Sequence, residues 1–199
     1  MKLLLHACCG PCAIYPIEAA LDAGHEITLF YVNPNIQPQL EWARRLENLQ
    51  TVALKKNLPL LIDPLYLEAA WLQRANDPER CHFCYQSRLS LVREKAEQEG
   101  FEAFSTTLLV SPYQNREAIV RVGKTLEREG LVFLADDWRD GYRDGQQKAR
   151  DMGLYRQKYC GCIPSIDESA FAAKIKKQHE LAALQALTAA PAPDNTSHK

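Results

Sequence analysis

The sequence predicts an α/β fold, in which helices cover both faces of a parallel β-sheet. Two observations support this class. Short apolar runs alternate with longer amphipathic segments along the chain, and several of the amphipathic segments stop at a glycine. Alternation of this kind is typical of a three-layer parallel sheet, because each helical crossover packs on one face of the sheet. Ligands of such folds bind at the carboxyl ends of the strands.

Each element is predicted from its local pattern. The strands are expected at Lys2–His6, Glu26–Asn33, Pro59–Asp63, Ala103–Leu108 and Leu131–Asp136. The helices between them are expected at Ile14–Ala23, Gln39–Lys56, Leu67–Ala75, Cys84–Glu99 and Tyr113–Glu129. A last helix is expected from Ser165, which has capping-box spacing to Glu168, to about Leu187.

Length and composition indicate one domain. Residues 1–187 are expected to form a single α/β domain that includes the C-terminal helix, and the polar, proline-interrupted residues 188–199 a disordered tail. The formal net charge of −1 points to neither nucleic acid nor membrane. No apolar run approaches the roughly 18 residues of a membrane span, and the start "MKLLLH" is too short for a signal peptide. We therefore expect a cytoplasmic protein with no membrane partner.

Seven cysteines lie in three tight groups along the chain: Cys8, Cys9 and Cys12; Cys81 and Cys84; Cys160 and Cys162. In a reducing cytosol this clustering favours metal ligation or redox chemistry over disulfide bonds. Buried structural thiols are the alternative, but these would be scattered along the chain.

The first group lies in "HACCGPC", between the first predicted strand and the first turn of the following helix. A phosphate-binding loop is not expected there, because the segment has a single glycine, Gly10, and Pro11 lacks an N–H. A helix N-terminus lowers the pKa of nearby thiols and so favours the thiolate that metals bind. Thiolate ligands are therefore the better interpretation.

The second group is a CxxC motif, "ERCHFCYQSRL", at the start of the fourth predicted helix. Zinc sites, redox dithiols and iron–sulfur clusters all use this spacing. The four thiolates of Cys8, Cys9, Cys81 and Cys84 could hold one zinc ion or one 4Fe–4S cluster. Adjacent cysteines make an awkward zinc knuckle, which favours the cluster.

The third group is "KYCGC". Cys160 and Cys162 either close into a small strained disulfide or both bind metal. A strained disulfide is a labile redox couple, and Gly161 gives the backbone the freedom that such a ring needs. The role of Cys12 remains open: it could ligate the cluster, hold a second metal with Cys160 or Cys162, or pack in the core.

Four segments in this order, "HACCGPC", "ERCHFCYQSRL", "STTLLVSPYQN" and "KYCGC", resemble the epoxyqueuosine reductases of the cobalamin-independent QueH family over about residues 2–165. The resemblance implies a variant of the adenine-nucleotide α-hydrolase (HUP-type) fold with a cysteine loop in place of the ATP loop. It also implies reduction of epoxyqueuosine to queuosine at the wobble position of tRNA.

The resemblance further implies that Cys8, Cys9, Cys81 and Cys84 bind a 4Fe–4S cluster and that Cys160 and Cys162 form a redox-active pair. Some relatives carry Asp where this chain has Cys12, beside a proposed extra iron. The resemblance therefore leaves open the role of Cys12, an additional iron ion, and whether three or four thiolates hold the cluster.

Removing an epoxide oxygen as water takes two electrons and two protons. A dithiol supplies two electrons, an iron with an open coordination site could act as a Lewis acid, and an external electron donor must reset the enzyme. His6, beside the first thiols, and Tyr159, beside the last pair, are the candidate catalytic proton donors. Orientation of the metal ligands is the alternative role for His6.

Contact with tRNA is predicted for the segment from Trp138 to Cys160, which has six basic and three acidic residues interleaved with aromatic ones. Cations for phosphate and rings for splayed bases are what recognition of single-stranded loops uses. The candidates are Arg143, Lys148, Arg150, Arg156 and Lys158. A solvated, salt-bridged helix face is the alternative.

Two other functions were weighed against the reductase. One is a non-catalytic RNA-binding module stabilised by zinc, which would be colourless where a cluster is brown. The other is an ATP-dependent tRNA thiolase, which needs a Ser/Gly-rich phosphate loop after the first strand. "HACCGPC" is not such a loop, and the sequence favours the reductase.

Overall fold

The structure is a computed structural model that describes residues 1–189, with side chains up to residue 185. Its centre is a five-stranded parallel sheet in the order β3-β2-β1-β4-β5. The strands are β1 (Lys2–His6), β2 (Glu26–Val32), β3 (Leu60–Asp63), β4 (Ala103–Thr106) and β5 (Val132–Phe133). The predicted α/β class is confirmed.

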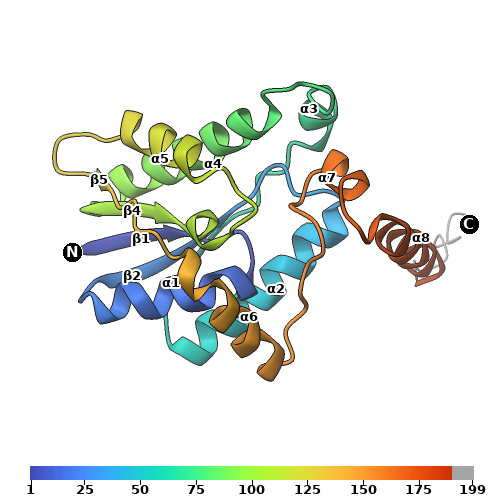
Figure 1. Cartoon of the computed structure of the whole chain (residues 1–199), viewed down its shortest axis with the longest axis horizontal. Helices are drawn as coiled ribbons and strands as arrows, with labels where there is room; N and C mark the ends of the chain where they lie inside the picture. Colours follow the sequence, from blue (N-terminus) through green and yellow to red (C-terminus); the bar gives the residue numbers. More distant parts are fainter. Residues whose placement is uncertain (190–199) are drawn as a thin grey trace, which may run out of the picture.

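Helices cover both faces of the sheet (Figure 1). One layer contains α1 (Gly10–Asp22), α2 (Gln39–Lys56) and α6 (Tyr142–Asp151), and the other contains α4 (Arg80–Gln98) and α5 (Arg116–Thr125). Because β1 is covered on both sides, Leu3, Leu4 and Leu5 are all fully buried. The two apolar faces of one sheet thus form a continuous core.

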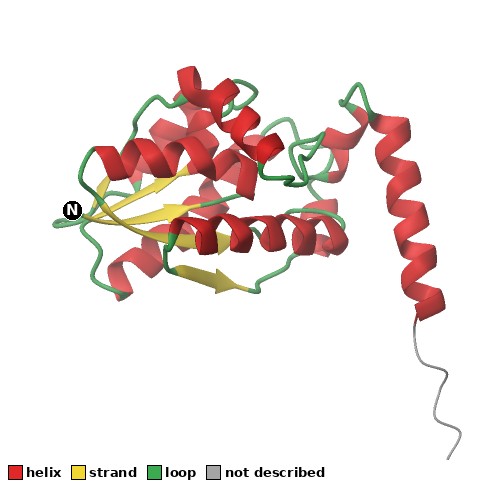
Figure 2. Cartoon of the chain, turned by 90° about the horizontal axis from the view of Figure 1, so that it is seen from below, coloured by secondary structure: helices red, strands yellow, loops and turns green. Residues whose placement is uncertain are grey.

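The remaining elements lie around this body. The short helices α3 (Glu68–Leu72) and α7 (Ile163–Asp167) lie beyond the carboxyl ends of the strands (Figure 1). The 3-10 turn η1 (Thr107–Val110) follows β4, and the 3-10 turn η2 (Arg139–Gly141) directly precedes α6. The last helix, α8 (Ala172–Ala189), projects away from the domain (Figure 2). None of the helices among residues 1–189 combines the length and the apolar character needed to cross a bilayer.

The strand order places the site. From β1 the chain builds outward through β2 to β3, and then returns to add β4 and β5 on the other side of β1. In such sheets a crevice opens outside the carboxyl ends of the strands where the order reverses. The segments that border it here are the cysteine loop after β1 and η1 after β4.

Two helices begin earlier than predicted. Helix α1 begins at Gly10 rather than Ile14, with Pro11 in the first turn, where proline is favoured. A Cβ on Gly10 would lie 2.7 Å from the backbone oxygen of Asn48, so glycine is needed for α1 and α2 to approach. Helix α4 begins at Arg80 rather than Cys84. Cys12 and Cys81 therefore lie in first helical turns, and Cys84 is the fifth residue of α4.

The predicted last helix is present as α8, which extends past the expected end near Leu187, but its predicted start at Ser165 is wrong. Helix α7 ends at Asp167 and α8 begins only at Ala172. The Ser165 hydroxyl does not cap a helix, because it donates to the Cys162 carbonyl at 2.6 Å and accepts from the Gly161 N–H at 3.2 Å. Of the predicted tail, residues 188 and 189 end α8, and 190–199 lie outside the described residues.

The predicted helix Tyr113–Glu129 is shorter in the structure. Its N-cap is Asn115, whose side-chain oxygen accepts from the Ala118 N–H at 3.0 Å. Asparagine is among the strongest N-cap residues, because its side chain satisfies a backbone donor that the helix leaves free. Residues 111–115 therefore form a loop at the carboxyl edge of the sheet rather than a first helical turn.

Candidate functional site

Three sulfurs gather in the loop between β1 and α1. The Sγ atoms of Cys8, Cys9 and Cys12 lie within 4.8 Å of one another, and all three residues are buried. Cys9 is the N-cap residue of α1 and Cys12 lies in its first turn, so the strand-to-helix turn itself brings the thiols together. We call these residues the inner thiol group; their spacing could accommodate a metal ion.

The surrounding polar groups hold the inner thiol group in place. Thr107 of η1 accepts from the Cys8 N–H at 3.3 Å, and its hydroxyl lies 3.7 Å from the Cys8 sulfur. The side-chain amide of Gln157 donates to the Cys9 sulfur at 2.9 Å and lies 3.5 Å from that of Cys12. Donors aimed at sulfur stabilise thiolates and tune the metals they bind.

Hydrogen bonds within the inner thiol group favour ionisation of Cys8. Hydrogen bonds from Cys12 and then Cys9 lower the pKa of Cys8 well below its usual range. The same hydrogen bond raises the pKa of Cys12. A hydrogen bond to the charged form favours that form, so these contacts favour ionisation of Cys8 over that of Cys12.

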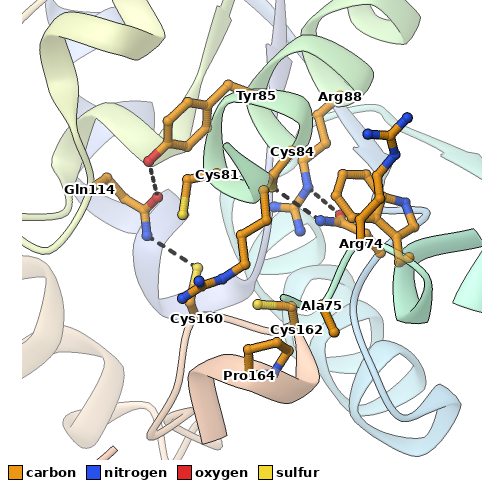
Figure 3. A pocket seen from close by; sticks show the side chains of 13 residues that line it. Arg74, Ala75, Cys81, Cys84, Tyr85, Arg88, Gln114, Cys160, Cys162 and Pro164 are labelled. Carbon is orange, nitrogen blue, oxygen red and sulfur yellow. Dashed lines mark hydrogen bonds between the residues drawn. The ribbon is translucent and has the colours of Figure 1, made fainter. Parts of the chain in front are cut away.

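Four other thiols surround a second site. Cys81, Cys84, Cys160 and Cys162 line a narrow cavity of about 30 Å³, which we call the narrow cavity. Figure 3 shows Cys81 and Cys84 descending from one turn of α4 toward Cys160 and Cys162, which lie just before α7. Residues three apart share a helix face, which is why both CxxC thiols reach the cavity. We call these four residues the outer thiol group.

Amide side chains also contact the outer thiol group (Figure 3). Asn35 donates to the Cys84 sulfur at 3.1 Å, and Gln114 donates to the Cys160 sulfur at 3.3 Å. The Gln114 carbonyl in turn accepts from the Tyr85 hydroxyl at 3.0 Å. Loss of water around Cys84 raises its pKa to about 11. Burial therefore favours the neutral form of the Cys84 thiol.

Arg88 connects the two thiol groups electrostatically. Its side chain is buried, lines the narrow cavity and donates from Nε to the Asn35 oxygen at 2.8 Å. Its positive charge acts on Cys84, Cys8 and Cys160, which belong to both groups. A buried cation needs compensating negative charge, and these thiols can supply it as thiolates.

A wider cleft of about 560 Å³ adjoins the thiols, and we call it the wide cleft. Its lining includes Cys8 and Cys12 from the inner group and Cys160 from the outer group. Cys160 and Gln114 border both the narrow cavity and the wide cleft. Six of the seven cysteines therefore border one or both of two cavities that share lining residues, and Cys9 lies beside Cys8 and Cys12.

The predicted RNA-binding residues divide into two sets. Arg156 and Lys158 line the wide cleft, whereas Arg143, Lys148 and Arg150 are not among its described lining residues. Lys148 is paired at 2.7 Å with both Glu18 and Asp144, and Arg150 bonds to Gln147. Lys148 on α6 therefore fits the alternative to RNA contact, which is a salt-bridged helix face.

The geometry does not favour His6 as a proton donor. His6 is fully buried, with Nδ1 at 2.8 Å from the Thr106 hydroxyl and Nε2 at 3.3 Å from the Asn33 oxygen. Burial, and then the charge of Arg88, lower its pKa to about 4, so the ring is neutral at neutral pH. Both ring nitrogens are engaged, and His6 instead joins β1 to β4 and to the end of β2 beneath the cysteine loop.

Tyr159 is also held in a structural contact. Its hydroxyl donates to the Gln37 carbonyl at 2.5 Å, and its ring is buried under the Arg45 guanidinium at 5.3 Å. Burial raises its pKa. The hydroxyl therefore anchors the chain just before Cys160 instead of facing the thiols.

Arg45 of α2 holds the backbone of the Cys160–Cys162 turn through hydrogen bonds. It is fully buried, pairs with Glu41 at 2.7 Å, and donates to the carbonyls of Cys160 at 2.8 Å and Tyr159 at 3.1 Å. Gly161 has a φ of +141°, and a Cβ there would lie 3.2 Å from Arg45 Nη1. The turn thus needs glycine both for its backbone and for its space.

Several of these residues were not predicted from the sequence. The sulfur-contacting amides Asn35 and Gln114 follow β2 and β4, so their place at the carboxyl edge was a usable signal. Gln157 and the buried Arg45–Glu41 pair had no such signal. Each contacts a cysteine segment more than 100 residues away in sequence.

The donor set fits a soft metal or a redox couple. All seven ligand candidates are thiols, and three amide side chains direct N–H groups at them. Thiolates select zinc, copper(I) and iron–sulfur clusters over hard cations. The fold and the site together define an α/β protein with a thiol-rich site, able to bind metal, at the crevice of a parallel sheet.

Comparison with known proteins narrows this class. A family model described as epoxyqueuosine reductase QueH matches residues 3–168. The chain belongs to this family and is an oxidoreductase, which confirms the resemblance seen in its motifs. Curated relatives named epoxyqueuosine reductase QueH occur in several bacteria.

The relative from Dehalococcoides mccartyi is 34% identical over 167 residues, which cover 82% of this chain and 92% of that protein. The relative from Thermotoga maritima is 34% identical over 178 residues, 83% of this chain and 91% of that protein. The relative from Haemophilus influenzae is 33% identical over 181 residues, which cover 84% of this chain and 73% of that protein.

Proposed function

We propose that this chain reduces epoxyqueuosine to queuosine at the wobble position of tRNA, using a 4Fe–4S cluster and the Cys160–Cys162 pair. One observation carries the proposal: the inner and outer thiol groups border two cavities that share Cys160 and Gln114 in their linings. Family membership supports the same reaction, because the relatives are named for it.

The cluster ligands in this proposal are Cys8, Cys9, Cys81 and Cys84. Cys12 is a further ligand, either for the cluster or for an additional iron ion, because its sulfur lies with those of Cys8 and Cys9. The positive charge of Arg88, which acts on Cys8 and Cys84, supports a shared anionic centre between these segments. When bound, a cluster supplies electrons one at a time.

In this proposal the Cys160–Cys162 pair supplies the electrons and protons that the reaction consumes. Both C–O bonds of the epoxide break, a C=C bond forms, and the oxygen leaves as water. The two thiols provide two electrons and two protons as they close to a disulfide, and an external electron donor reduces that disulfide after each turnover. Cys160 borders both the narrow cavity and the wide cleft, where it can meet the substrate.

The remaining side chains position these groups. Gln114 holds the Cys160 sulfur, and Arg45 and Gly161 fix the turn that carries it. His6 and Tyr159 keep the strand ends and the turn in register, and neither supplies a proton. The wide cleft, with Arg156 and Lys158 in its lining, receives the tRNA.

The test is direct. The anaerobically reconstituted protein is incubated with tRNA that contains epoxyqueuosine and a strong reductant, and the nucleosides are analysed by mass. A product lighter by one oxygen atom is expected, and a Cys160→Ser variant with unchanged metal content serves as the inactive control. An unchanged nucleoside with the brown, cluster-loaded protein contradicts the proposal.

A further inference from the structure

The rim of the wide cleft presents an exposed aromatic ring. Tyr113 lines this cleft and has 81% of its surface exposed, although the next residue, Gln114, contacts the Cys160 sulfur. Its ring stands at 82° to the ring of Tyr142, with the centroids 6.0 Å apart. This edge contact leaves a face of the Tyr113 ring open to solvent.

The backbone that carries this ring is held on both sides. The Tyr113 N–H donates to the Ser111 hydroxyl at 3.3 Å, and the Gln114 N–H donates to the Ser111 carbonyl at 3.4 Å. The Tyr85 hydroxyl accepts from the Asn115 N–H at 3.3 Å. The ring is thus presented from an ordered segment, which lowers the entropic cost of binding a partner against it.

The charges around the cleft indicate what kind of molecule meets the ring. Arg156 and Tyr142 both line this cleft, and Lys158 Nζ lies 5.1 Å over the ring of Phe171, which is also exposed. Single exposed aromatics are common and carry no meaning by themselves. Rings and cations together along one cleft are the combination that binds unpaired nucleotides.

We propose that Tyr113 is a stacking platform for an unpaired RNA base next to the modified nucleoside. Stacking there holds the RNA loop while the modified base enters the cleft toward Cys160. The inference rests on the proposed function for its substrate, and adds the residue that recognises the single-stranded loop around it.

The experiment measures binding, not turnover. The probe is an RNA hairpin whose unpaired loop carries epoxyqueuosine, and the comparison is a fully paired RNA of the same length. Tyr113→Ala is expected to weaken hairpin binding by about 5- to 150-fold, the range of base–aromatic stacking. Tyr113→Phe keeps the affinity within about twofold, because the stacking face is retained.

The matched control is Leu54→Ala, which removes an equally exposed side chain, 83% accessible, from the C-terminal part of α2. It is expected to leave hairpin binding unchanged. The paired RNA is expected to bind equally to all variants. Because the Tyr113 ring is exposed, Tyr113→Ala is expected to melt within a degree or two of the wild type, which separates binding from folding.

A second readout tests stacking itself. With 2-aminopurine in the loop beside the modified nucleoside, wild type and Tyr113→Phe quench its fluorescence and Tyr113→Ala does not. The inference is overturned if Tyr113→Ala binds within twofold of wild type, if it quenches equally, or if wild type does not prefer the hairpin to the paired RNA.

Failure of the inference is distinguishable from failure of the proposed function. Oxygen loss by wild type together with unchanged hairpin binding by Tyr113→Ala rejects the stacking role alone. Loss of loop binding in Tyr113→Ala, without oxygen loss by wild type, rejects the reductase and leaves the RNA contact standing.

Discussion

The inner and outer thiol groups differ in how they are built. The inner group comes from one five-residue stretch, Cys8 to Cys12, and its residues are buried, although Cys8 and Cys12 border the wide cleft. The outer group joins α4 to the turn before α7, and two of its members, Cys81 and Cys160, are exposed. The first group is therefore drawn from one strand-to-helix turn, whereas the second depends on packing between distant segments.

This difference suits two tasks. Enclosed thiolates keep water and oxidants away from a metal and tune it through fixed hydrogen bonds. Within the outer group, Cys81 and Cys84 are proposed cluster ligands, whereas the proposed redox pair of Cys160 and Cys162 has to meet both a substrate and an electron donor, and this requires access. The predictions below test the division, beginning with the largest expected effect.

Serine in place of one cysteine from each group separates the tasks. Cys8→Ser is expected to lose bound metal and turnover together, because it removes a ligand. Cys160→Ser is expected to lose turnover by at least about 100-fold while keeping the metal, because no disulfide can form. Iron and sulfide analysis, visible absorbance and single-turnover assays measure both. Equal metal loss in both variants contradicts the division.

The support beneath the outer group is the buried pair of Arg45 and Glu41. Arg45→Met is expected to destabilise the protein by about 3–5 kcal/mol, because Glu41 is left as a buried unpaired charge. Urea unfolding measures this change.

The control is Lys95→Met, which breaks the exposed pair with Glu99 and is expected to cost less than about 1 kcal/mol. A double replacement, Arg45→Met with Glu41→Leu, is expected to recover part of the stability, since it removes the orphaned charge as well. Equal costs for Arg45→Met and Lys95→Met would show that the buried pair gives the turn no special support.

Each thiol group also relies on one glycine. Gly10→Ala places a Cβ 2.7 Å from the Asn48 backbone oxygen and is expected to cost about 1–3 kcal/mol by overpacking. Gly161→Ala is expected to cost about 1–3 kcal/mol, because the backbone there is strained for alanine.

Gly153→Ala is the control for backbone strain alone, because it has a φ of +68° and no atom within 4 Å of the added Cβ. Thermal unfolding of the three variants measures the comparison. If Gly161→Ala costs no more than Gly153→Ala, the contact with Arg45 adds nothing to the requirement for glycine.

The amide donors give the smallest and most selective effects. Gln157→Leu, which removes the donor to Cys9, is expected to lower metal affinity by about 10- to 100-fold. Gln114→Leu, which removes the donor to Cys160, is expected to leave metal affinity unchanged and to alter the reduction potential of the outer pair. Competition with a chelator and a thiol redox titration separate these outcomes.

The sequence predicted the regular elements best where several local signals agree. The bounds of β1 and α2 match the structure at both ends. Three successive leucines specify a strand buried on both faces, and α2 combines an apolar stripe with an Asn in left-handed conformation at its end. Where signals conflicted, as at Gly10–Pro11 or Ser165, helix starts were misplaced.

The functional site was likewise predicted best where the signal is local in the sequence. The cysteine motifs and the carboxyl edge were visible in the sequence, because residue type and strand order need only short stretches to read. The sequence did not show that the thiols form groups of three and four, nor which amide side chains bind them. Gln157 reaches Cys9 across 148 residues, and no local pattern encodes a contact of that length.

The sequence by itself determined the α/β class, the thiol chemistry and the family, because periodicity and motifs are written within a few neighbouring residues. Only the tertiary structure decided that Cys12 lies with Cys8 and Cys9, that Arg45 supports the Cys160 turn, and that His6 is enclosed. These outcomes depend on how helices pack across the sheet, and that packing is set by the whole chain at once.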